Sequence, residues 1–399
     1  MKNDENKGRE EEQYNENKKS LWQALNISNF ELIFVILLAL LVLFFGFDGK
    51  TPIGLNIGIW AIIFPLTLGL WFTFRTSEWA VEGLDAGAKY LKQTDYVAGV
   101  ISSLASNMPE AVLALLFITS GKEHGVLIGL VSVLAAAGFN TIIFGLIVVM
   151  GSKDTGSFPI EEKTIFQELV LMRWAFVALT VSVFVGIIEH LQFIEQKIDG
   201  NLFLEQPTLP KFASLLLVAS YLVYLFYLLI EQRKVAVSNN IQASKPHISK
   251  LVTLIILVMG FVGIVIGGKL IEGSIEVILE HKEIKPLLIA LILGGAGSIP
   301  EHGIALVSAR EEKIEVAIGN AVGGILQTSL LIFGLLGLFI TVPLEPFILI
   351  QFAATAGVLW FIKVAIQNDH RLDMYEGIMV LLLQTFIFLL FFFDIKAFT

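Results

Sequence analysis

Two glutamates stand alone inside long apolar stretches of this chain. Glu110 and Glu301 each follow a proline, and each pair is preceded by small or polar residues. A carboxylate in an apolar segment is costly to bury and usually marks an ion or proton path. Proline removes a helical hydrogen bond, and glycine lets the backbone open. The preceding residues are Ser106, Asn107 and Met108 in the first case, and Gly294 to Ser298 in the second.

The freed backbone carbonyls would lie beside these carboxylates and hydroxyls. Such oxygen ligands are the ones that hard cations such as Ca²⁺ prefer, and an open backbone at membrane depth is tolerated where it lines a cavity. The residues therefore predict a cation site that contains Glu110, Glu301, Ser298, Ser106 and Asn107. The alternative is that each glutamate pairs privately with a neighbour and only holds helices together.

Two amides and one histidine extend this candidate site. Asn140 and Gln327 follow the glutamates at comparable spacing, each after a run of small residues that lets helices approach closely. An amide oxygen can complete a cation shell without adding charge, although each amide could equally make a helix–helix hydrogen bond. His302, next to Glu301, could relay protons or act from behind the ligands. The acids Glu78, Glu82, Glu272 and Glu276 could face the ion path or solvent, and Glu189 with His190 is expected at the membrane interface.

The elements that carry these residues are apolar segments of membrane-spanning length. The chain has 399 residues, of which 55% are hydrophobic and 16% charged, whereas soluble domains carry about 25% charged residues. A span needs roughly 20 apolar residues, so we predict an all-α membrane protein with about 11 spans. These are residues 31–47, 57–91, 96–120, 125–150, 170–190, 211–231, 251–281, 286–309, 314–340, 345–366 and 373–395.

Composition also excludes several classes of function. The chain has no cysteine, which excludes disulfides, thiolate metal sites and thiol catalysis. No glycine-rich nucleotide loop precedes a Lys-Ser or Lys-Thr pair, which argues against an ATP-driven pump. Residues 1–30 begin with a polar run that predicts a disordered tail, and because no apolar segment with a small-residue cleavage site stands there, we expect the first membrane helix to stay uncleaved. We expect partners to be the lipid bilayer and transported cations, with no nucleic acid, and the sequence does not indicate an oligomeric state.

The chain repeats itself around the two Pro-Glu pairs. Glu82-Gly83 precedes Glu110, and Glu272-Gly273 precedes Glu301, at nearly equal distances, and each Pro-Glu is followed by an apolar run and a charged turn. Two halves of five spans each would insert in opposite orientations, which is the inverted-repeat plan of secondary transporters. The predicted parts are a tail (1–30), an extra helix (31–47), a first repeat (57–231), a cytoplasmic linker (232–250) and a second repeat (251–395).

The distribution of Lys and Arg predicts the orientation. With the N-terminus in the cytoplasm, more of these residues fall on cytoplasmic than on outer segments, as the positive-inside rule requires. We therefore expect a multi-pass protein, of the cell membrane, with a cytoplasmic N-terminus.

The two repeats resemble those of the cation/Ca²⁺ exchanger superfamily. The resemblance lies in the Pro-Glu turns and in the small-residue helices that end in Asn140 and Gln327, and it covers about residues 57–150 and 251–340. Glu301-His302, Ala317-Ile318-Gly319 and Gln327 look like the Ca²⁺/H⁺ branch, whereas the Pro-Glu pairs look more like the sodium-coupled branch. A sodium-coupled exchanger usually has an Asp where this chain has Gln327.

The resemblance implies a secondary antiporter, with Ca²⁺/H⁺ exchange as the first expectation and Na⁺ coupling, as Na⁺/Ca²⁺ or Na⁺/H⁺ exchange, as the second. No enzyme activity and no cofactor are expected. Outside this class, a passive cation channel and an intramembrane metalloenzyme are the alternatives. A channel would dissipate gradients without coupling, and an enzyme would need a nucleophile or a fuller set of metal ligands.

Overall fold

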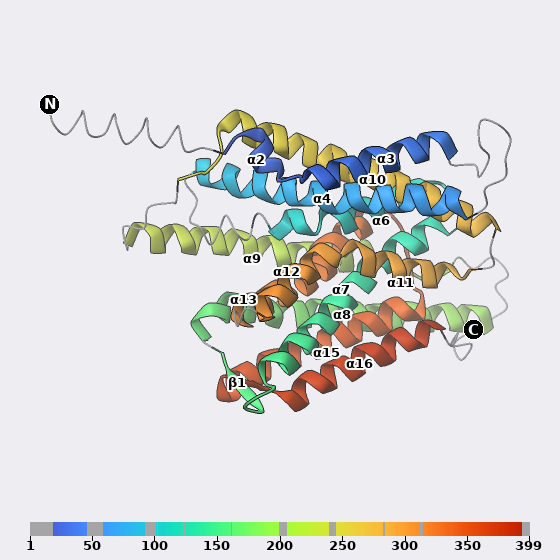
Figure 1. Cartoon of the computed structure of the whole chain (residues 1–399). Helices are drawn as coiled ribbons and strands as arrows, with labels where there is room; N and C mark the ends of the chain where they lie inside the picture. The colour runs from blue at the N-terminus through green and yellow to red at the C-terminus, as the bar shows by residue number, and fades with distance from the viewer. Residues whose placement is uncertain are drawn as a thin grey trace, which may run out of the picture. The chain divides into compact units, whose positions relative to one another are not determined.

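The computed structural model describes residues 19–45, 59–91, 101, 103–122, 124–160, 162–198, 206–238, 245–281, 284–310 and 314–392 (Figure 1). Nearly all of these residues are helical. Within the described ranges, six helices are long and apolar enough to cross a membrane. They are Gly125–Gly151, Leu169–Ile198, Lys211–Ile230, Lys250–Leu279, Ala317–Phe339 and Pro346–Asp369.

The chain divides into two compact units. The first comprises Met1–Met108 and Leu229–Val277, and the second comprises Pro109–Leu228 and Ile278–Thr399. The helices whose middles lie in the first unit are α2 (Leu21–Leu25), α3 (Asn29–Phe45), α4 (Trp60–Tyr90) and α10 (Lys250–His281).

The two longest helices of the first unit, α4 and α10, pack closely along glycines. A Cβ atom at Gly69 would lie 2.8 Å from the carbonyl oxygen of Gly267, and one at Gly260 would lie 2.7 Å from the backbone nitrogen of Ala80. Residue numbers that rise along α4 therefore meet residue numbers that fall along α10, so the pair is antiparallel. Small residues at both contacts let the two backbones approach, as is usual between helices in membranes.

Residues 19–27 and 245–250 form a strap on the polar half of α4. Ser20 caps α2 in a capping box with Gln23, which explains a helix inside the segment predicted to be a disordered tail. Residues 1–18 of that segment lie outside the described residues. The Lys19 amide donates to the His247 carbonyl at 3.0 Å, and the Trp79 indole N–H donates to the Leu25 carbonyl at 3.0 Å.

Two of the acids on α4 have partners that the structure shows, one of them in the strap. Glu82 accepts from Lys19 at 3.3 Å and lies 3.0 Å from Nε2 of His247, and Glu78 pairs with Arg75. On α10, Glu272 is buried and pairs with Lys269 at 2.7 Å. Each of these three acids therefore has a cationic partner within its own unit.

The second unit contains the remaining helices. They are α6 (Met108–Thr119), α7 (Gly125–Gly151), α8 (Glu162–Ile198), most of α9 (Lys211–Ser238), α11 (Pro286–Gly297), α12 (Ile299–Arg310), α13 (Ile314–Leu326), the π-helix η1 (Gln327–Ile332), α14 (Phe333–Phe339), α15 (Pro346–Asp369) and α16 (Met374–Phe392). The most apolar stretch of α7 is mostly buried, and so is that of the continuous helical run from α13 to α14. These two helices therefore form the middle of the unit. The α8 helix extends well beyond the predicted range 170–190.

Two short β-ladders join the segments between these helices. Strand β1 (Ser157–Pro159), after α7, pairs antiparallel with β4 (Arg371–Asp373), before α16. Strand β2 (Thr208–Leu209), before α9, pairs antiparallel with β3 (Val342–Pro343), after α14. Each ladder thus joins a strand that follows a central helix to a strand that precedes the last helix of the other half.

The central helices α7 and α14 also pack against the last helix of the opposite half. Gly145 of α7 contacts Gly377 and Leu381 of α16, and Gly334 of α14 contacts Leu217 and Val218 of α9. Both glycines occupy the middle of a Phe-Gly-Leu triplet. Each half therefore places its final helix against the central helix of the other half.

Candidate functional site

Glu110 lies in the first turn of α6 and is only 3% exposed. Its side chain packs on the backbone of Gly297, because a Cβ atom at that glycine would come within 3.1 Å of Cγ of Glu110. The glycines before Pro300 thus do more than loosen the helix. They leave the space that the glutamate of the other half fills.

Ser298 is the single turn residue between α11 and α12, and it lies beside Glu110. Its hydroxyl donates to the Gly294 carbonyl at 2.6 Å. Because a hydroxyl carries one proton, this bond competes with any donation from Ser298 to the carboxylate beside it. Neither carboxylate oxygen of Glu110 has a hydrogen-bond partner of acceptable geometry among the described residues.

A buried carboxylate without a donor needs a counter-charge or a proton. Leaving it ionised and unpaired in an apolar interior costs several kcal/mol or more. A bound cation or protonation of the carboxylate would remove that cost. The geometry around Glu110 is therefore suited to alternate between a cation-loaded state and a protonated state.

Asn140 is fully buried in α7, the helix on which α11 packs. Gly294 contacts the backbone of Ser132 and Ala136, and Gly295 contacts the ring of Phe139. Ser298 lies one turn beyond Gly294, and Asn140 lies one turn beyond Ala136. The close approach of α7 and α11 at these small residues positions the elements that carry both polar side chains.

Gln327 is 5% exposed and is the first residue of the π-helix η1, which also packs on α7. Widened helical turns of this kind occur frequently at functional sites. The next two residues are buried as well. Thr328 donates to the Gly324 carbonyl at 2.5 Å, and Oγ of Ser329 has no hydrogen-bond partner in the part of the chain that the structure describes.

The other predicted residues lie in α12 and just before α6. His302 is in α12, is 9% exposed, and its ring centre lies 6.3 Å from that of Phe139. Glu301 precedes it in α12, and its side chain lies outside the described residues. Ser106 and Asn107 belong to the first unit, where Asn107 is the turn residue before α6, three residues ahead of Glu110, as Ser298 is three residues ahead of Glu301.

A polar cluster next to this region was not predicted from the sequence. Gln351 and Gln384, on α15 and α16, exchange hydrogen bonds of 3.3 and 3.1 Å, and Gln351 also donates to Thr355 at 3.2 Å. The amide of Gln384 lies against Gly138, two residues from Asn140. Two glutamines in apolar helices are a weak signal in the sequence, because nothing in their spacing shows that they meet.

Part of the helix surface near Gln327 is open. A Cβ atom built at Gly319 or Gly323, one turn apart in α13, would meet no atom of the described residues within 4 Å. Groups of three or more His, Cys, Asp or Glu that could hold a metal ion are absent from the described residues, which do not include the side chain of Glu301.

Comparisons with known proteins agree with this architecture. The family model for "Sodium/calcium exchanger protein" matches residues 59–230 and 252–393, most of the chain. An uncharacterized membrane protein of Methanocaldococcus jannaschii is 21% identical over 258 residues, which are 64% of this chain and 74% of that protein.

Two solved structures share the fold. The crystal structure of the H⁺/Ca²⁺ exchanger CAX superposes with a TM-score of 0.63 at 13% identity, over 92% of this chain and 93% of that one. The sodium-calcium exchanger NCX_Mj superposes with a TM-score of 0.54 at 16% identity, over 82% of this chain and 98% of that one.

Proposed function

Because this chain belongs to the sodium/calcium exchanger protein family and is an integral membrane protein, we propose that it is a secondary antiporter that exchanges Ca²⁺ for H⁺. In this proposal, Glu110 and Glu301 bind the cation near the middle of the bilayer. Asn140, Gln327, Ser298, Ser106, Asn107 and freed carbonyls complete the oxygen shell, and His302 relays protons.

The observation that carries the proposal is the state of Glu110. Its carboxylate is buried against Gly297, and the Ser298 hydroxyl beside it donates to the Gly294 carbonyl. The same two oxygens can accept a proton or coordinate Ca²⁺, but not both at once. Competition between the two ions at one carboxylate is the simplest way to couple their movements.

The amide at Gln327 favours protons over Na⁺ as the coupling ion. Gln327 supplies an oxygen without a charge, so two carboxylates would carry the whole charge of the site. Two carboxylates match one Ca²⁺ or two protons. A third acid at this position, as the sodium-coupled branch usually has, would favour additional monovalent cations.

The exchanged packing of the second unit supports an inverted repeat. A two-fold operation that swaps the halves would exchange α7 with α14, β1 with β3, and β2 with β4. It would therefore convert the β1–β4 ladder into the β3–β2 ladder, and both ladders exist. The contacts of Gly145 and Gly334 exchange in the same way. Inverted repeats place the transport site at the repeat interface.

The division of the chain into units supports a mechanism of alternating access. The long helices α4 and α10 share one compact unit and pack tightly through glycines, so they would move together. Sliding of this pair would expose the site first to one side of the membrane and then to the other.

Transport into proteoliposomes tests the proposal. Ca²⁺ uptake should be driven by an opposing H⁺ gradient and should not respond to a Na⁺ gradient. Uptake that requires Na⁺ and ignores pH would assign the chain to sodium-coupled exchange. Ca²⁺ flux that needs no counter-ion, even with the membrane potential clamped, would instead identify a passive channel. If the folded protein carries no Ca²⁺ flux under any of these conditions, the proposed transport of Ca²⁺ is wrong.

A further inference from the structure

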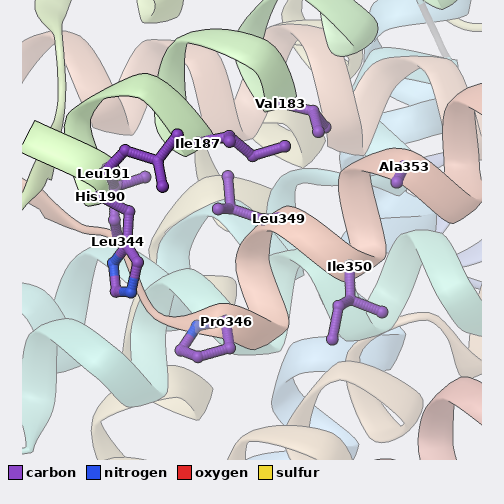
Figure 2. Close-up of a pocket in the computed structure, with 9 residues that line it drawn as sticks. All are labelled: Val183, Ile187, His190, Leu191, Leu344, Pro346, Leu349, Ile350 and Ala353. Atoms are coloured by element: carbon purple, nitrogen blue, oxygen red, sulfur yellow. The ribbon is translucent and has the colours of Figure 1, made fainter. Parts of the chain in front are cut away.

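An apolar cavity of about 370 Å³ lies between α8 and the first turns of α15, within the second unit (Figure 2). One wall comes from α8, including Val183, Ile187 and His190, and the other comes from the chain around Leu344, Leu349 and Ala353. The cavity is separate from Glu110 and the other predicted cation ligands, none of which lines it.

The cavity opens to the phase that surrounds the helices. Both α8 and α15 contain a segment apolar and long enough to cross the membrane. Of the lining residues, Ile187 is 42% and Leu191 is 59% exposed, and Ala353 is exposed as well. In a membrane protein these side chains face lipid, so hydrocarbon is the material that can enter. An empty apolar cavity would forfeit dispersion contacts along its walls.

The two ends of the cavity differ in polarity. From Val183 to His190 the cavity follows about two turns of α8, roughly 10 Å. His190 is at the end near Leu344, which directly follows strand β3, and Figure 2 shows its ring beside Leu344 while Ala353 and Val183 lie at the other end. A polar group at one end and carbon along the rest match an amphiphile that enters lengthwise.

We infer that this cavity binds one acyl chain of a membrane phospholipid. The ester region lies beside His190, at the β2–β3 end of the helices, and the chain extends towards Ala353. The lipid fills the space between α8 and α15, which belong to different halves of the sequence, and so stabilises their contact. Gly186 helps to form the wall, because a Cβ atom there would lie 2.5 Å from Cδ2 of Leu349.

Photolabelling in proteoliposomes tests this site without Ca²⁺ or ion gradients, so the result does not depend on transport. The probes are two phosphatidylcholines with a diazirine either next to the ester or at the middle of the acyl chain. The ester-proximal probe should label peptides that contain His190 and Pro346. The mid-chain probe should label peptides that contain Val183 and Ala353.

A matched pair of variants separates this site from ordinary surrounding lipid. Val183→Phe fills the cavity, whereas Val177→Phe makes the same change at a 40%-exposed position of α8 that does not line it. Val183→Phe should reduce labelling of the cavity peptides at least fivefold, and Val177→Phe should leave it unchanged. If Val183→Phe does not fold, Ala353→Phe, at an exposed lining position, replaces it.

Equal labelling of all lipid-facing helices would show annular lipid only and would overturn the inference. Labelling that persists in both filling variants would do the same. As an independent measurement, added phosphatidylcholine should raise the thermal unfolding temperature of the delipidated wild type more than that of Val183→Phe, because ligands that bind only the folded state stabilise it. Equal shifts would contradict a specific lipid site.

Discussion

The Glu110 side chain rests directly on the backbone of Gly297, at 3.1 Å from the position that a Cβ atom would take. This contact joins the Pro-Glu helix of the first half to the glycine-rich turn of the second. It also defines how far the carboxylate can reach, because the glycine leaves no spare space on that side.

Gly297→Ala should therefore displace the Glu110 carboxylate and weaken cation binding. Overpacking of this kind typically costs about 1–3 kcal/mol, which corresponds to a rise of at least about fivefold in the half-saturating Ca²⁺ concentration. The control is Gly303→Ala in α12, where a new Cβ atom would meet no described atom within 4 Å. Equal Ca²⁺ dependence in the two variants, measured by uptake into proteoliposomes, would show that the contact is irrelevant to binding.

Neutralising either glutamate should stop transport. Glu110→Gln and Glu301→Gln each remove a charge that Ca²⁺ requires and that protons titrate. Removing a charge from an apolar segment lowers the cost of insertion, so the unfolding temperature should not fall. Glu195→Gln, at an exposed position near the end of α8, serves as the control and should transport normally. Near-normal exchange by either site variant would exclude that glutamate from the mechanism.

The strap on α4 gives a prediction that concerns stability rather than transport. Glu82→Gln removes the ion pair with Lys19 and the carboxylate contact with His247, which tie residues 19–27 and 245–250 to α4. Exposed ion pairs contribute about 0–1 kcal/mol each, so backbone amides of the strap should exchange faster with deuterium while transport is retained.

The matched control for the strap is Asp85→Asn. Asp85 pairs with Lys89 within α4 itself, at 2.7 Å, so its loss releases no other segment. Faster exchange in the strap only for Glu82→Gln is the expected result. If transport fails in Glu82→Gln while the strap still exchanges slowly, Glu82 instead belongs to the ion path.

The sequence predicted the helices well because apolar length is a local property. Helix occurs within every predicted span. In the span predicted at 96–120, residues 101 and 103–106 are helical, Asn107 is a turn residue, and helix resumes at Met108. Residues 92–100 lie outside the described ranges. The α8 helix is longer than predicted because its ends are polar, and hydropathy detects only the apolar middle of a helix.

The candidate site was predictable in its residue types but not in its contacts. Pro-Glu turns and buried amides are visible in the sequence, whereas the contact of Glu110 with Gly297 depends on tertiary packing. The sequence contains one weak indication of the π-helix at Gln327, which is a difference in spacing between the two halves. Phe144-Gly145 begins three residues after Thr141, but Phe333-Gly334 begins five residues after Thr328. A wider helical turn accommodates extra residues of this kind without breaking the helix.

The inverted repeat makes a prediction about topology that is independent of any family resemblance. The turns that precede β1 and β3 follow the central helices of the two halves, so inversion must place them on opposite sides of the membrane. Asp154 and Thr341 are exposed in these two turns.

Because the chain has no cysteine, a single Cys at either position can be labelled without background. With the N-terminus in the cytoplasm, Thr341→Cys should react with an impermeant thiol reagent added outside intact cells. Asp154→Cys should react only after the membrane is opened. Reaction of both from the same side would show that the halves are not inverted, and the placement of Glu110 and Glu301 in one shared site would then fail.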